Sequence, residues 1–379
     1  MASRAQQLQS IGQSVWLDFI RRGHLASGQF DELVRDQGVV GVTSNPTIFQ
    51  QAITESDDYD DALGALVAER LDPAQIFDRL SAQDIQDACG RLRPVWERTN
   101  GLDGRVSIEV QPGLAHDTAG TIAEARRLHA LVARDNVMVK IPATAEGVPA
   151  IAEAIAEGIC INVTLIFSLA RYEQVMDAYL TGLERRAAAG QPLAPIVSVA
   201  SFFVSRVDTK VDKAIDEAAA KLADTDPKRA DLLALRGKAA IANARLAYAR
   251  FREVFSSPRF TALQARGARV QRPLWASTGT KNKAYPDTLY VDELVGADTV
   301  NTLPLATLTA FNDHGRVEPA IQRDLDAARA LFPRLESLGI PVGALIDQLE
   351  PEGVAAFAKS YDALIEGIAS RRRELMNAR

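Results

Sequence analysis

Lys140 is the residue of this chain best suited to covalent chemistry. Of 43 basic residues only 9 are lysines, and Lys140 is the only one before position 210. It lies within an apolar run, NVMVKIP. Lysine, unlike arginine, can lose its proton and form an imine with a carbonyl group. Composition alone favours a simpler interpretation, in which the side chain reaches from a strand end to water.

Strand alternation changes that interpretation. If NVMVKIP is a strand, its apolar residues face one side and Lys140 faces the other. The runs SVWLDFI, VSIEV and INVTLIF alternate in the same way, and in the last of them Leu165 is expected to face the surrounding helices. The polar side chains turned to the opposite, inner side are Asp18, Glu109, Asn162 and Thr164.

A buried lysine beside two carboxylates lowers stability unless the groups are paired or functional. A structural salt-bridge network in the core is therefore one interpretation. The other is a nucleophilic amine, because burial next to apolar side chains such as Met138 and Ile141 favours the neutral form that attacks a carbonyl. Schiff-base chemistry at Lys140 is the prediction.

The elements that must position these groups are short β-rich runs separated by amphipathic helical segments. Eight such β-α units predict a closed (β/α)8 TIM barrel, with an open doubly wound sheet as the alternative. No GxGxxG or Walker sequence follows any of the runs, which disfavours a nucleotide-binding sheet. The predicted strands span residues 14–20, 38–44, 104–110, 136–142, 161–167, 195–202, 273–278 and 298–304.

The length of 379 residues exceeds the roughly 250 of a typical barrel. We expect a single decorated domain, 1–379, with a barrel core at about 14–311. Additional helices are expected at the N-terminus, between strands two and three, between strands six and seven (about 208–260) and at the C-terminus (about 317–376). Within the charged helical segment 208–255, residues 208–232 are expected to form a solvated helical pair rather than a binding tail.

Composition excludes several function classes. A net charge of −6 argues against nucleic acid or an anionic membrane as the main partner. No apolar run is long enough to span a membrane and no signal peptide is recognisable, so a cytoplasmic location is expected. Cys89 and Cys160 lie 71 positions apart without a CxxC motif, and the four histidines lack metal-binding spacing. We therefore expect two buried cysteines and no metal site.

Five strings occur in order along the predicted strands: GVTSNPTIF, VSIEV, VMVKIPAT, INVTLIFS and SFFVSRVD. Together, over about residues 14–311, they resemble transaldolases of the longer bacterial subgroup. The resemblance implies a class I barrel enzyme without metal or cofactor that acts in the pentose phosphate pathway. It would transfer a dihydroxyacetone unit from sedoheptulose 7-phosphate to glyceraldehyde 3-phosphate, giving erythrose 4-phosphate and fructose 6-phosphate. Its partners would be small sugar phosphates, with no nucleic acid or membrane, and the chain would be a monomer or homodimer.

The same resemblance implies catalytic roles at four positions. Lys140 would form the imine with the donor ketose. Asp18 would be the general acid/base at the hydroxyl beside the breaking carbon-carbon bond. Glu109 with Thr164 would hold the water that moves protons during imine formation.

The remaining positions that the resemblance implies bind substrate. Two amides would hold the dihydroxyacetone hydroxyls, a serine would match a substrate-site serine, and loops after strands six and seven would clamp the phosphate. These residues are, in that order, Asn45, Asn162, Ser201, Arg206, Ser277 and Lys281, and Phe203 is also expected to bind substrate. Shorter transaldolases carry an arginine soon after the strand-seven serine, whereas this chain has STGTKNKAYP, so Lys281 would supply a point charge instead. For Arg206 the alternative is a surface ion pair with Asp208.

Two other functions are alternatives for such a barrel. Fructose 6-phosphate aldolases, which release dihydroxyacetone, resemble this chain but carry a tyrosine where it has Phe203. A phenyl ring offers no proton to let the enamine escape, so transfer is favoured. A non-enzymatic barrel scaffold would be indicated by loss of Lys140, Asp18 or Glu109, and all three are present.

Overall fold

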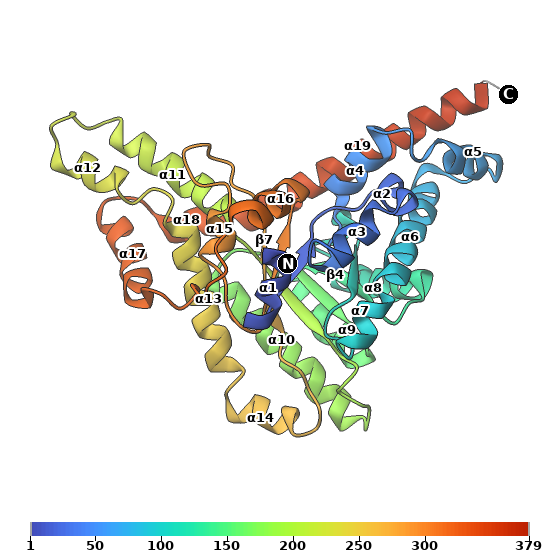
Figure 1. Cartoon of the computed structure of the whole chain (residues 1–379), viewed down its shortest axis with the longest axis horizontal. Helices are drawn as coiled ribbons and strands as arrows, with labels where there is room; N and C mark the ends of the chain where they lie inside the picture. Colours follow the sequence, from blue (N-terminus) through green and yellow to red (C-terminus); the bar gives the residue numbers. More distant parts are fainter. Residues whose placement is uncertain (1, 378–379) are drawn as a thin grey trace.

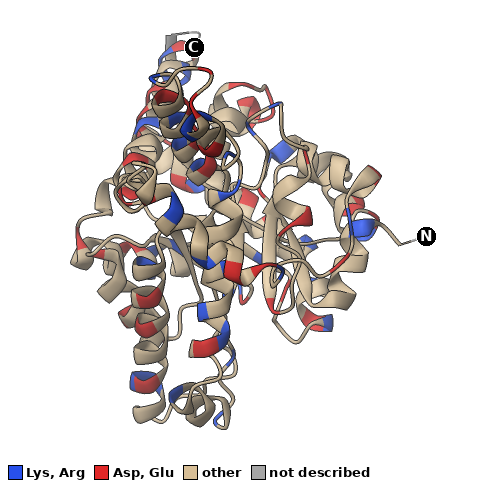
Figure 2. Cartoon of the chain, turned by 90° about the vertical axis from the view of Figure 1, so that its left-hand side faces the viewer, with Lys and Arg blue, Asp and Glu red and all other residues tan. Residues whose placement is uncertain are grey.

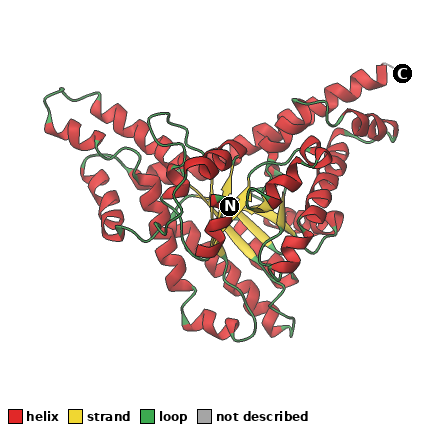
Figure 3. Cartoon of the chain, viewed as in Figure 1, coloured by secondary structure: helices red, strands yellow, loops and turns green. Residues whose placement is uncertain are grey.

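Eight parallel strands close into a barrel in sequence order, enclosed by helices (Figure 3). The computed structural model describes residues 2–377. The predicted TIM barrel is confirmed, and each predicted β-rich run overlaps one strand. The strands are β1 (Gln13–Leu17), β2 (Val39–Val42), β3 (Arg105–Glu109), β4 (Val137–Pro142), β5 (Ile161–Ile166), β6 (Ser198–Phe203), β7 (Arg272–Ala276) and β8 (Thr299–Leu303).

Helices connect the strands and extend the barrel (Figure 1). Those of the first half are α1 (Arg4–Ile11), α2 (Arg22–Ser27), α3 (Gln29–Arg35), α4 (Pro46–Thr54), α5 (Asp60–Ala68), α6 (Pro73–Arg91), α7 (Arg93–Arg98), η1 (Pro112–Leu114), α8 (Thr118–Val132), α9 (Gly147–Glu157) and α10 (Leu169–Ala188). The second half contributes α11 (Ser205–Ala219), α12 (Pro227–Leu233), α13 (Ala239–Val254), α14 (Pro258–Gln264), α15 (Leu289–Asp292), α16 (Leu305–His314), α17 (Leu325–Ser337), α18 (Val342–Asp347) and α19 (Leu349–Asn377). The extra helices thus occur at the four expected places.

The strands are apolar and buried because parallel strands have helices on one face and the barrel interior on the other. In β4, for example, every residue from Val137 to Pro142 is buried. Charged residues of both signs are spread over the outer helices (Figure 2). Helix α11 shows the pattern: Val207, Val211 and Ile215 are buried at helical spacing, and its opposite face is charged.

Leu165 departs from the predicted alternation. The pairing of β5 with β6 shifts register between Val163 and Ile166, and Leu165 adopts a left-handed backbone with φ 59°. Its side chain reaches Gly353 of α19, where an added Cβ would lie 2.9 Å from Leu165 Cδ2. A β-bulge of this kind breaks the two-residue period on which the prediction rested.

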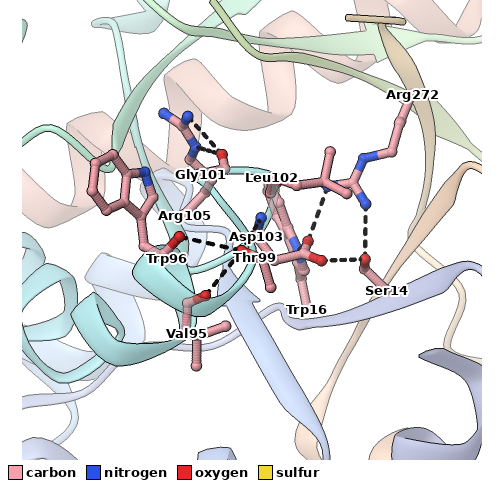
Figure 4. Close-up of polar contacts among 10 residues, drawn as sticks. All are labelled: Ser14, Trp16, Val95, Trp96, Thr99, Gly101, Leu102, Asp103, Arg105 and Arg272. Carbon is pink, nitrogen blue, oxygen red and sulfur yellow. Dashed lines mark hydrogen bonds and ion pairs between the residues drawn. The ribbon is translucent and has the colours of Figure 1, made fainter. Parts of the chain in front are cut away.

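The N-terminal end of the barrel is closed by a network of buried polar groups (Figure 4). Arg272 of β7 donates to Ser14 Oγ at 2.8 Å and forms an ion pair with Asp103 at 2.9 Å. Arg105 of β3 donates to the carbonyl of Gly101 through two of its nitrogens. These charges are held at the end of the barrel opposite the predicted site.

Within residues 2–377, no helix is long and apolar enough to cross a membrane. Both cysteines are buried and free, as expected. Burial raises the pKa of the Cys89 thiol to about 12.

Candidate active site

Lys140 lies inside the barrel near the C-terminal end of β4, with only 5% of its side chain exposed. Its Nζ is 3.1 Å from Oε2 of Glu109, which occupies the neighbouring position of β3 in register. The ammonium also donates to the backbone oxygen of Ser44 at 3.1 Å. The predicted inward orientation is therefore confirmed, and the reach to water is not observed.

Asp18 follows directly after β1 at the same end of the barrel. Its Oδ1 accepts a hydrogen bond from Thr43 Oγ1 at 2.7 Å, and that hydroxyl is also 2.7 Å from Thr302 Oγ1. Thr43 therefore fixes the orientation of the Asp18 carboxylate. Thr43 was not predicted from the sequence as a site residue; its position one residue beyond a barrel strand is the signal that could have indicated it.

Both carboxylates have perturbed proton affinities. Burial raises the pKa of Asp18 above its usual range, against the opposing effects of Lys140 and the Thr43 hydrogen bond. Burial likewise raises the pKa of Glu109, with Lys140 opposing and the negative charge of Asp18 reinforcing the rise. Carboxyl groups shifted toward neutrality can both accept and return a proton, as general acid/base chemistry requires.

An amide and two hydroxyls extend the site along β5 and β6. Asn162 is adjacent to Lys140 in register; its Oδ1 accepts from Ser201 Oγ at 2.7 Å and its Nδ2 donates to Ser107 Oγ at 3.0 Å. Ser201, whose direction the sequence left open, therefore points inward. Thr164 is fully buried, and its Oγ1 has no hydrogen-bond partner among the described residues.

Asn45 lies in the turn after β2, next to the residue that contacts Lys140. Its Oδ1 accepts from the backbone N–H of Ile48 at 3.0 Å and so caps α4, which has Pro46 in its first turn. Asparagine at the cap followed by proline is a favourable start for a helix. The string SNPTIF thereby fixes the backbone that positions Asn45 and the Ser44 carbonyl, which accepts from Lys140.

Arg206 is in the first turn of α11, and no carboxylate among the described residues lies within 4 Å of it. The alternative pairing with Asp208 is not observed: Asp208 accepts from Ala240 N at 2.7 Å and from Tyr290 Oη at 2.8 Å. Burial raises the pKa of Asp208 to about 7. Arg206 therefore keeps an unneutralised charge, and that charge acts on Asp18.

The loop after β7 carries the other two predicted phosphate positions. Ser277 has a left-handed backbone with φ 55°, and its hydroxyl is 3.0 Å from Ser205 Oγ at the start of α11. Lys281 is exposed and, within residues 2–377, has no ion-pair partner, yet its charge also acts on Asp18. The structure thus brings the strand-six and strand-seven loops together at the barrel mouth.

Comparison with known proteins identifies the family of the chain. The sequence profile of the transaldolase/fructose-6-phosphate aldolase family matches residues 15–368. The chain is 53% identical over 372 residues to a transaldolase of Thermobifida fusca (strain YX), covering 98% of this chain and 99% of that protein. It is 48% identical over 376 residues to transaldolase 2 of Streptomyces coelicolor, covering 99% of each. The chain belongs to the transaldolase/fructose-6-phosphate aldolase family.

One aromatic residue at this family site was not found from the sequence. Phe203 of β6, which was predicted, is 6% exposed, and its ring lies 5.3 Å from Arg206 Cζ. Phe357 of α19 is 5% exposed and lies over the same mouth, 5.8 Å from Lys140 Nζ. Phenylalanine in a long amphipathic helix is indistinguishable from a core residue in sequence, so no signal pointed to it.

Proposed function

We propose that the chain is a transaldolase in which Lys140 carries the covalent intermediate. It transfers a dihydroxyacetone unit from sedoheptulose 7-phosphate to glyceraldehyde 3-phosphate, giving erythrose 4-phosphate and fructose 6-phosphate, a step of the pentose phosphate pathway. The observation that carries the proposal is a single buried lysine at the mouth of the barrel, ion-paired to Glu109 and accompanied by Asp18. Relatives about 50% identical over nearly the whole chain bear the transaldolase name.

Imine formation begins at Lys140 Nζ. The neutral amine adds to the ketose carbonyl, and the resulting carbinolamine loses water to give the protonated imine. Glu109, 3.1 Å from Nζ, and the unpartnered Thr164 hydroxyl are suited to hold a water that moves these protons.

Bond cleavage is the task of Asp18. Its carboxylate, oriented by Thr43, takes the proton from the hydroxyl beside the breaking carbon-carbon bond. The bonding electron pair moves into the protonated imine, which leaves an enamine on Lys140 and releases the aldose. The acceptor aldehyde is then attacked by the enamine, Asp18 returns its proton to the new hydroxyl, and water hydrolyses the imine.

Substrate recognition divides between two regions of the mouth. Asn45 and Asn162, with Ser201 supporting Asn162, hold the dihydroxyacetone hydroxyls. Arg206, Ser277 and Lys281 receive the phosphate. The two cations suit this role because neither is neutralised by a carboxylate of the described chain.

Release of dihydroxyacetone is the activity to be distinguished, because the family includes fructose 6-phosphate aldolases. Phe203 places a ring without a hydroxyl beside Arg206. The enamine therefore lacks a proton donor at this position, and an acceptor aldehyde ends the reaction.

Borohydride trapping tests the proposal. Reduction in the presence of fructose 6-phosphate should attach a three-carbon adduct to the peptide that contains Lys140, detected by mass spectrometry. Lys140→Met should give no adduct, whereas Asp18→Ala should give a six-carbon adduct because imine formation precedes cleavage. An adduct on another lysine, or none in the native chain, would contradict the mechanism.

The finer details stay predictions. These are the monomeric or homodimeric state, the cytoplasmic location and the role of Lys281 in place of an arginine.

A further inference from the structure

The ring of Phe357 bridges the two functional halves of the barrel mouth. It lies 5.8 Å from Lys140 Nζ and 5.9 Å from Arg206 Cζ. Phe203 approaches the same guanidinium at 5.3 Å. Arg206 therefore contacts two phenyl rings, from β6 and from α19, and both distances are within the range of cation-π attraction.

Helix α19 is fixed on both sides of this ring. Beyond Phe357, the Ser360 hydroxyl lies 2.8 Å from that of Thr47 on α4. Before it, Arg171 of α10 forms an ion pair with Glu350 at 3.0 Å. These contacts tie the helix to connections that follow β2 and β5, so it crosses the C-terminal ends of the strands.

Glycine allows the helix to come close. Gly353 is one turn before Phe357 and so lies on the same helix face. A Cβ atom there would be 2.9 Å from Leu165 Cδ2 and 3.6 Å from Arg206 Nη1. The left-handed Leu165 and the missing Cβ together seat α19 directly against the guanidinium.

We propose that Phe357 is a specificity-determining residue that, with Phe203, holds Arg206 for the substrate phosphate. Cations in proteins are commonly oriented by carboxylates, but a carboxylate neutralises the charge that a phosphate needs. Two phenyl faces orient the guanidinium by cation-π attraction while adding no negative charge. Because Phe357 also contacts Lys140, it sets the separation between the imine and the phosphate. The inference rests on the proposed function, since it assigns Arg206 to phosphate.

The consequence is selectivity for phosphorylated donors. Loss of the ring should raise KM for fructose 6-phosphate, because Arg206 is no longer held in place. It should change kcat/KM for unphosphorylated fructose much less, because that donor offers Arg206 no anion.

The test compares both donors in Phe357→Leu, which keeps apolar volume but removes the ring. We expect KM for fructose 6-phosphate to rise about 5- to 30-fold with kcat within about threefold. The ratio of kcat/KM for fructose 6-phosphate to that for fructose should fall by a similar factor. Phe357→Tyr, which keeps the ring, should retain the native ratio. Leu364→Ala is the matched control, because it removes a buried side chain two turns further along the same helix.

Three results of these assays would contradict the inference. Equal selectivity in native chain and Phe357→Leu, or an equal loss with both donors, would overturn the inference. A fall in the ratio in Leu364→Ala would do so as well, because it would trace the effect to helix packing. If Phe357→Leu does not fold, Phe357→Met takes its place with the same expectations. Borohydride trapping at Lys140 separates the two proposals: trapping in every variant with unchanged selectivity removes only this inference, whereas no trapping in the native chain removes the proposed function.

Discussion

Both ends of the barrel bury an ion pair, and they hold it differently. At the C-terminal end Lys140 faces Glu109 at 3.1 Å; at the N-terminal end Arg272 faces Asp103 at 2.9 Å. Side-chain exposure is similarly low, 5% and 6% for the first pair and 4% and 10% for the second. Depth alone therefore does not distinguish a reactive pair from a structural one.

The N-terminal pair is held by several hydrogen bonds. Asp103 accepts from Ser14 Oγ at 2.7 Å, from Trp16 Nε1 at 3.1 Å and from Arg272 at 2.9 Å, as Figure 4 shows. The cation is a guanidinium, which does not lose its proton in proteins. The pair is thus fixed by several partners, as a structural role requires.

The C-terminal pair is bonded sparsely. Lys140 donates to the Ser44 carbonyl, Asp18 accepts from Thr43, and Glu109 Oε2 has only the ion pair among the described groups. Burial raises the pKa of both carboxyl groups. The C-terminal end therefore has fewer hydrogen bonds than the N-terminal end. Because few fixed donors hold its carboxylates, protons can move between its groups more easily.

Removing the cation from each end should give the largest difference in activity and stability between the two ends. Lys140→Met should lower kcat/KM at least about 10⁴-fold, because no other group can carry the imine. Arg272→Met should leave kcat/KM of the folded protein within about threefold but lower the free energy of unfolding by about 3–5 kcal/mol, since Asp103 stays buried without its partner. A coupled transaldolase assay and urea unfolding measure the two effects. Substantial activity in Lys140→Met would break the comparison.

The sequence predicts those features of the two barrel ends that follow from regular strand alternation. The inward direction of Lys140 followed from strand alternation, which is a backbone property and holds along β4. The predicted direction of Leu165 was wrong because a bulge interrupts that alternation in β5. The Arg272–Asp103 pair was not predicted, since each residue resembles an ordinary surface charge until the barrel closes. Phe357 depends on where α19 crosses the barrel, and this is set by tertiary contacts far along the chain.

Replacing the carboxylate at each end should change stability in opposite directions. Asp103→Asn removes the charge that offsets Arg272, and we expect a loss of about 3 kcal/mol at all pH values from 5 to 8. Asp18→Asn removes a carboxylate whose folded pKa is raised. The ionised form of that carboxylate destabilises the fold, so native stability from this group is lost as pH rises from about 3.9 through the folded value.

The Asp18→Asn variant should therefore be more stable than the native chain at pH 8, by about 1 kcal/mol, with the advantage shrinking toward pH 4. Urea unfolding at several pH values measures this while activity is lost. Ser14→Ala serves as a control for the other end, because it removes the hydroxyl that donates to Asp103 and accepts from Arg272, at a loss of about 1.5–3 kcal/mol. If Asp18→Asn is less stable than the native chain at pH 8, the ionised Asp18 carboxylate stabilises the fold as that of Asp103 does.

The smallest expected effect concerns the exposed cation at the mouth. Lys281→Ala should raise KM for fructose 6-phosphate about 3- to 10-fold with little change in kcat, because an exposed ammonium adds a screened point charge to the phosphate site. Lys283→Ala is the matched control, since Lys283 is also exposed on the same loop but, unlike Lys281, is not among the charges that lower the pKa of Asp18. The difference in KM between the two variants should shrink in high salt. The kinetic constants of Arg272→Met, relative to those of the native chain, should not depend on salt in this way, because Arg272 is buried in its network. A Lys281 effect that persists unchanged in high salt would indicate a buried, directional contact, and the mouth would then hold this cation much as the opposite end of the barrel holds Arg272.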